Sequence, residues 1–237
     1  AGEGVNGNAN SGNTGVGKNS LLAITTGNSN VAIGNEAAKA LTDGTENVFI
    51  GDGTVQTSTS VRYAVAIGRG AAQNGDIAQT ADGFVAVGYK ALEALTGGAK
   101  NLAIGYSALS DLTTGENNVM IGWNAAVSAN DAGFDNNVGV GNYVFDAVAS
   151  GIDAVGNTAV GHAAMSEVLT DAADYNTAIG YTALNALTSG TQNTAVGNAA
   201  GLVLTSAADN VIIGANAGDA LQDGGDNTFV GQNAGGA

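Results

Sequence analysis

The chain has 237 residues, with 38 glycines and no proline or cysteine, and 44% of its residues are hydrophobic although only 11% are charged. This apolar content excludes a disordered chain, which cannot bury enough apolar surface to offset its conformational entropy. The lack of cysteine excludes a disulfide framework, and the formal net charge of −15 disfavours binding to nucleic-acid phosphates, which needs clustered Lys and Arg.

The first twelve residues are a Gly/Asn-rich lead-in, and a single repeat domain is predicted from residue 13 to residue 237. The opening residues, Ala1 to Gly4, do not read as a signal peptide. No apolar run approaches the ~20 residues that span a bilayer, so we expect no membrane insertion.

From Asn13 onward, a unit with the signature Asn-x-x-(Ile/Val)-Gly recurs thirteen times in register, with the Asn replaced in two copies. Eight of the twelve gaps between successive motif glycines are 17 residues long, and the others are two or three residues longer. The extra residues are predicted to leave the coil as surface loops near 73–82, 128–134, 147–153 and 167–174. The predicted fold class is a β-solenoid of about 13 coils of about 17 residues, with one short parallel strand per coil.

The strand is predicted just before the motif glycine. The residue before this glycine is Ile or Val in every copy, and Thr, Val or Leu stands two places earlier. Because alternate residues share one face of a strand, we interpret the Ile/Val row as the structural core. The row comprises Ile33, Ile50, Ile67, Val87, Ile104, Ile121, Val140, Val160, Ile179, Val196, Ile213 and Val230. The small residue between the two is then the outer face, where other copies would pack.

Asn stands four places before the motif glycine in eleven of the thirteen copies, and Ala64 and Phe84 are the exceptions. Asn tolerates left-handed backbone geometry, bonds to its local chain and can form an amide ladder when stacked. The glycine is expected to end the strand in a tight turn.

The pattern of the second half of the unit is clearest in residues 88–97 and 180–190, where apolar residues follow the motif glycine at offsets three, four and seven. This spacing predicts one or two helical turns, with a later glycine as the C-cap. A second short strand followed by a turn is the alternative.

The units Asn176–Leu184 and Asn193–Ala200 resemble the repeats of phage tail-fibre and related bacterial surface proteins. The core Val31–Gly34 is similar to the head repeats of trimeric autotransporter (YadA-like) adhesins, although the unit here is longer. The resemblance extends from about Asn13 to Gly235. It implies a left-handed, β-roll-like, homotrimeric rod that serves as an extracellular fibre or adhesive head.

An aromatic stripe is predicted at or next to the position after the motif glycine. Its members are Tyr89, Tyr106, Trp123, Tyr143, His162 and Tyr181. On consecutive coils these rings would stack at the inter-strand spacing. They are candidates for binding the sugar rings of a cell-surface glycan. The alternative is that they stack on one another or fill a seam between chains, because Tyr and Trp favour interfaces.

We find no catalytic constellation and expect no enzyme. His162 is the only histidine, and the many Ser and Thr residues lack an activating base. The acidic group Asp219, Asp223 and Asp226 is a weak candidate for Ca²⁺, but it matches no known calcium-loop pattern, and ordinary use of Asp in turns is preferred. No cofactor is therefore expected.

The predicted function is a non-enzymatic structural or adhesive module of a tail fibre, surface adhesin or extracellular filament, located outside the cell. Its partners would be other copies, as a homotrimer or an end-to-end filament, and a cell-surface glycan. The alternative is a glycan- or ice-binding solenoid that acts through one regular face. The ice version needs a flat array of Thr, but the row three places before the glycine, such as Thr177, reads as inward.

Overall fold

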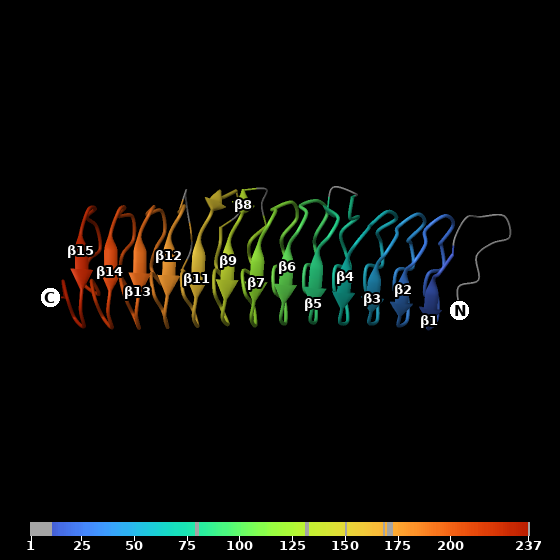
Figure 1. Cartoon of the computed structure of the whole chain (residues 1–237), viewed down its shortest axis with the longest axis horizontal. Coiled ribbons are helices and arrows are strands. Elements are labelled where there is room, and N and C mark those ends of the chain that lie inside the picture. The colour runs from blue at the N-terminus through green and yellow to red at the C-terminus, as the bar shows by residue number, and fades with distance from the viewer. Residues whose placement is uncertain are drawn as a thin grey trace. The chain divides into compact units, whose positions relative to one another are not determined.

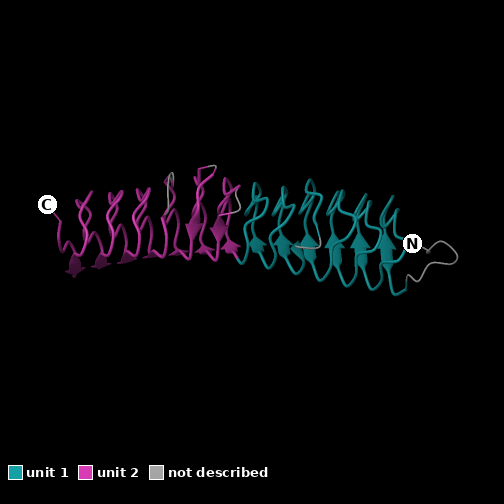
Figure 2. Cartoon of the chain, turned by 90° about the horizontal axis from the view of Figure 1, so that it is seen from above, with its two compact units in different colours: residues 1–117 teal, residues 118–237 magenta. Residues whose placement is uncertain are grey.

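The computed structural model of the chain describes residues 11–78, 81–130, 133–149, 151–167, 169 and 173–236. Most of the predicted lead-in, residues 1–10, lies outside the described residues. The chain comprises two compact units, residues 1–117 and residues 118–237 (Figure 2). The single repeat domain from residue 13 onward stays a prediction.

Unit 1 contains six three-residue strands that pair in parallel and in chain order (Figure 1). They are β1 (Thr14–Val16), β2 (Val31–Ile33), β3 (Val48–Ile50), β4 (Val65–Ile67), β5 (Val85–Val87) and β6 (Leu102–Ile104). In each pair, equivalent repeat positions are partners, as in Thr14 with Val31. The strands therefore fall where the repeat predicted them.

Unit 2 contains seven three-residue strands, again parallel and in register. They are β7 (Val119–Ile121), β9 (Val138–Val140), β11 (Thr158–Val160), β12 (Thr177–Ile179), β13 (Thr194–Val196), β14 (Val211–Ile213) and β15 (Thr228–Val230). Two longer coils add a second, two-stranded parallel sheet, β8 (Phe134–Asp135) with β10 (Ala154–Val155). The chain is thus a parallel β-solenoid with a main strand in each coil, as predicted.

The predicted helical turns are wrong, because the described residues contain no α-helix. Lys90 and Leu92, in the copy that read best as helical, have φ of 57° and 54°. The amide of Leu92 donates to the carbonyl of Ala108 in the next coil, at 3.0 Å. Such bonds between coils replace the bonds within a helix. The second short strand, the alternative, occurs among the described residues only as β8 and β10.

The assignment of the core within the strand is also wrong. The middle residue of each strand is buried in every coil except that of Phe229, which is half-buried. In contrast, no member of the Ile/Val row is buried, and Ile33, Ile179 and Val230 are 38%, 40% and 65% exposed. The residues that were predicted to form the core and instead lie on the outer face are Ile33, Ile50, Ile67, Val87, Ile104, Ile121, Val140, Val160, Ile179, Val196, Ile213 and Val230.

The physical reason for this inversion is the narrow interior of a 17-residue coil. Small residues such as Ala103 meet the inward side chains of the second half of the unit, and Ala108, Leu109 and Leu112 are fully buried with it. Most coils place a small side chain in this space, and Phe49, Met120 and Ile212 are larger side chains that are fully buried there. Because a close-packed interior of fixed width cannot take a bulky side chain at this position in every coil without overpacking, the Ile/Val row occupies the outer face of the strand.

The predicted amide ladder of the Asn row is confirmed. In unit 1 the side-chain amide of Asn47 donates to the side-chain oxygen of Asn30, at 2.8 Å. In unit 2 the ladder runs from Asn118 to Asn227 without a break. Left-handed backbone geometry belongs to the residue before each Asn, for example Glu46 with φ of 59°. The Asn is therefore needed for its side chain, because an unpaired buried amide is costly.

Two features require a glycine at the motif position: the backbone conformation and the close approach of the next coil. Gly180 has φ of 143°, a conformation that L side chains rarely adopt. A Cβ at this position would overlap the carbonyl oxygen of Gly197, the motif glycine of the next coil. The glycines thus stack too closely for any side chain.

Candidate functional site

The outer surface of the main strands, which we call the sheet face, consists of the two rows that flank the buried middle residue. One row is the Ile/Val row, and the other is the Thr, Val or Leu three places before the motif glycine. Every residue in both rows is half-buried or exposed. Both rows point away from the coil interior, because alternate side chains of a strand lie on opposite faces and the residue between them is the inward one.

The sheet face carries no charge. All 27 charged residues of the chain (21 Asp and Glu, 6 Lys and Arg) lie outside the three strand positions of the repeat. The extra residues of the four longer coils fall in the second half of the unit, outside the three strand positions. Several of those residues (79–80, 131–132, 150, 168 and 170–172) lie outside the described residues. The sheet face is therefore uncharged and regular.

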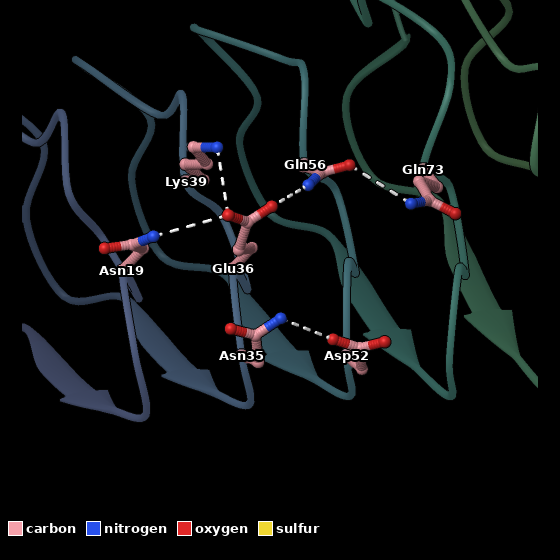
Figure 3. Close-up of polar contacts among 7 residues, drawn as sticks. All are labelled: Asn19, Asn35, Glu36, Lys39, Asp52, Gln56 and Gln73. Carbon is pink, nitrogen blue, oxygen red and sulfur yellow. Dashed lines mark hydrogen bonds and ion pairs between the residues drawn. The ribbon is translucent and has the colours of Figure 1, made fainter.

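In unit 1, the edge beside the sheet face begins as a polar network (Figure 3). The carboxylate of Glu36 accepts hydrogen bonds from Lys39 at 3.0 Å, from Asn19 at 3.3 Å and from Gln56. The Lys39 bond is the main cause that lowers the pKa of Glu36 below its ordinary value. Closer to the strands, Asn35 donates to Asp52 at 2.8 Å. The Lys39 bond lies within one coil, and the other contacts join consecutive coils.

Further along unit 1, the same edge becomes aromatic. Tyr89 and Tyr106 stack with ring centroids 4.9 Å apart and an interplanar angle of 23°. The ammonium of Lys90 lies 5.7 Å from the centroid of the Tyr89 ring and pairs with Glu93 at 3.1 Å. The predicted stacking on consecutive coils is therefore present here.

In unit 2, three consecutive coils bring Tyr143, His162 and Tyr181 together, and we call these three residues the aromatic ridge. His162 stacks on Tyr181 with centroids 5.4 Å apart, and Tyr143 meets His162 edge-on at 5.5 Å. Tyr143 and Tyr181 are 37% and 56% exposed. Trp123, one coil before Tyr143, is 47% exposed, and its backbone amide donates to the side chain of Asn142 at 2.9 Å.

Two exposed tyrosines were missed by the sequence analysis. Tyr63 and Tyr175 are 56% and 64% exposed and stand five places before the motif glycine, at the opposite end of the strand from the ridge position. Their backbones are left-handed, with φ of 57° at both residues. The signal was present in the repeat, because this slot otherwise holds Gly, Asn and polar residues.

The acidic candidates for Ca²⁺ are used in turns. Asp223 accepts hydrogen bonds from the hydroxyls of Thr205 and Ser206, each at 3.0 Å, and Asp226 takes a left-handed turn position with φ of 61°. Across residues 11–236, where they are described, no group of three or more His, Asp or Glu side chains is arranged to hold a metal ion. Asp219, Asp223 and Asp226 are thus not brought together as a metal centre.

Comparison of the chain with family models, with curated proteins and with solved structures gives no match. Within its described residues, the chain has no helix with the length and apolar character needed to cross a membrane. The surfaces that carry a functional argument are therefore the sheet face and the aromatic positions beside it.

Proposed function

We propose that the chain is a structural and adhesive fibre module whose copies associate with one another through the sheet face. The observation that carries this proposal is the contrast between an uncharged, β-branched sheet face and a chain of net charge −15. Exposed apolar patches on otherwise polar surfaces mark interaction sites. The partner we assign is a second copy of the same chain.

The charge distribution favours a copy as the partner. Two chains of net charge −15 repel each other wherever their acidic surfaces meet. The sheet face is the surface of the main strands where two copies can approach without bringing carboxylates together. Burial of its rows, for example Val138 with Val140, would gain roughly 25 cal/mol per Å² of apolar surface.

This proposal changes the surface through which copies meet. The row of small residues was predicted to pack against other copies, but residues such as Ala178 are fully buried within their own coil. The outward Thr177 and Ile179 take that role instead. A homotrimer, a left-handed coil and a location outside the cell follow from the resemblance to tail-fibre and adhesin repeats, and they form part of the proposal.

The test is the mass of the purified chain in light scattering at micromolar concentration. We expect a multiple of 23.0 kDa, and three copies for the homotrimer. Ile179→Glu puts a carboxylate on the sheet face of every copy, and we expect it to lower the mass to one chain while circular dichroism remains unchanged. Asn198→Glu adds the same charge at an exposed position off this face and should leave the mass unchanged. A monomeric wild-type chain would refute the proposal.

A second candidate function, ice binding, is supported by one observation. The objection to it was that the Thr row reads as inward, but Thr158, Thr177 and Thr194 are half-buried members of the outward face on three consecutive coils. The two functions compete for the same surface, since a face covered by another copy cannot bind ice. A monomer with thermal hysteresis would favour ice binding, and an oligomer without it would favour the fibre module.

A further inference from the structure

We propose that the aromatic ridge of unit 2 binds a linear, uncharged polysaccharide, laid across consecutive coils. This inference rests on the proposed function, because it names the class of receptor that an adhesive module would contact. It starts from the three rings of Tyr143, His162 and Tyr181, which follow one another on coils whose strands β9, β11 and β12 are hydrogen-bonded neighbours.

The fold does not require aromatic rings at this place. The position after the motif glycine, which His162 and Tyr181 occupy, holds Asn35, Asp52, Arg69, Ala215 and Gln232 in other coils, and all of these coils have the same strand. Tyr143 stands one place further on, where other coils hold residues such as Asn19, Gly53 and Ala163. Ring side chains here leave apolar surface exposed, as at Tyr181, which is 56% exposed. Surface aromatics that the fold can spare indicate a binding role.

The shape and chemistry of the ridge suit a sugar chain. The ring centroids are spaced by 5.4 and 5.5 Å, so a linear glycan lying along the ridge can place successive sugar rings against successive coils. Apolar ring surface contacts the C–H groups of a sugar, while the Tyr hydroxyls, the imidazole and the carboxamide of Asn142 are hydrogen-bond partners for its hydroxyls. The stacking covers part of each ring, and Tyr181 is 56% exposed whereas Tyr143 is 37% exposed.

The negative charge of unit 2 indicates which class of glycan the ridge can bind. Residues 118–237 contain eleven Asp and Glu residues and no Lys or Arg, a formal charge of −11. A sulfated, phosphorylated or uronic-acid polysaccharide would meet this field with no cation to pair with, and like charges are repelled. The ligand is therefore an uncharged glycan.

The experiment uses the whole chain and its single tryptophan, Trp123, one coil before the ridge, as the reporter. The probes are hexasaccharides of β-linked glucose, β-linked N-acetylglucosamine and α-linked mannose, with dextran sulfate as the charged comparison. Saturable binding is measured by fluorescence and by titration calorimetry. We expect at least one neutral probe to bind and dextran sulfate not to bind.

Variants decide whether the ridge is the site. His162→Asn and Tyr181→Asn introduce the residue that the same slot already holds at Asn35 and Asn198, so the coils should fold. We expect each to weaken binding by about tenfold or more. Tyr175→Asn is the matched control, because Tyr175 lies in the same coil as Tyr181, is 64% exposed and stands outside the ridge. It should bind as wild type does.

Three results would overturn the proposal. They are no saturable binding of any neutral probe, preferential binding of dextran sulfate, or unchanged binding by both ridge variants. Light scattering on the same samples separates this failure from failure of the fibre module, because it reports self-association independently. If His162→Asn or Tyr181→Asn lowered the mass, the ridge would be a seam between copies, and the glycan assignment would be wrong.

Discussion

The side-chain amide of Asn193 donates to the side-chain oxygen of Asn176, one coil earlier, at 3.0 Å, and both residues are buried. The same oxygen accepts the backbone amide of Asn193 at 2.9 Å. The amide of Asn176 in turn donates to Asn157 and to the carbonyl of Gly190. Asn176 thus ties its own coil to the coils on both sides.

We therefore predict that Asn176→Ala destabilises unit 2 by about 3 kcal/mol, because it leaves several buried donors and acceptors without partners. Chemical denaturation followed by circular dichroism measures the change. Asn198→Ala, at an exposed position in the same unit, should change the free energy of unfolding by no more than about 0.5 kcal/mol. Equal effects of the two substitutions would show that the ladder adds nothing beyond ordinary surface contacts.

The stacked motif glycines give a second prediction. Gly180→Ala should prevent the native stacking of its coil, since the new Cβ overlaps the Gly197 carbonyl and φ is 143°. Gly83→Ala is a useful comparison, because Gly83 has φ of +79° but nothing within 4 Å of the added Cβ. It should cost only the backbone strain, about 1 kcal/mol. Hydrogen exchange near each site checks both, and a Gly180→Ala chain with wild-type protection would contradict the steric argument.

Glu36 gives a prediction for acid pH. Its pKa is lowered, first by the hydrogen bond from Lys39. A carboxyl whose pKa is lower in the folded chain contributes stability above its unfolded value, near 4.5, and loses it as the pH falls through the folded value. Glu36→Gln should therefore lower the melting temperature at pH 7 and have little effect at pH 2. A pH-independent difference would rule out the charge as the cause.

Asp146 is predicted to make stability depend on pH in the opposite direction. Burial is the main cause that raises its pKa above 3.8, and the nearby Glu167 adds to the shift. The folded chain then holds the proton more tightly than the unfolded chain, so stability declines as the pH rises from below 3.8 through the folded value. Asp146→Asn should raise the melting temperature at pH 7 and leave it nearly unchanged at pH 2. A carbon-13 NMR titration of the Asp146 carboxyl gives the direction of the shift directly.

The uneven charge predicts that salt acts differently on the two units. Unit 2 has a formal charge of −11 and no Lys or Arg, whereas the four ion pairs found among the described residues all lie in unit 1. Salt at 0.1 M screens charges beyond about 10 Å. Added NaCl should therefore slow hydrogen exchange in residues 118–237 more than in residues 1–117. Equal slowing in both units would count against repulsion within unit 2.

The repeat, the coil length, the position of each main strand and the Asn ladder could all be predicted from the sequence, whereas the two-residue strands β8 and β10 could not. Gly197 lies 17 residues after Gly180, and this spacing alone implied that Thr177 would pair with Thr194. Regular spacing has this power because stacked coils must place equivalent residues beside one another. The aromatic positions followed from the same register, and for that reason Tyr89 was expected to meet Tyr106.

Two features depended on contacts that a sequence pattern does not encode. Alternation shows that Val31 and Ile33 share one face of their strand, but it does not show whether that face or Ala32 lies inside. The choice was made by the narrow coil interior, which has room for Ala32 beside the second half of the unit. Likewise, the apolar spacing after Gly88 matched a helix, yet the amide of Leu92 bonds to Ala108 in the next coil. Hydrogen bonds between coils satisfy the backbone amides and carbonyls there. The residues of the turn can therefore take left-handed φ angles that their local sequence preferences do not predict.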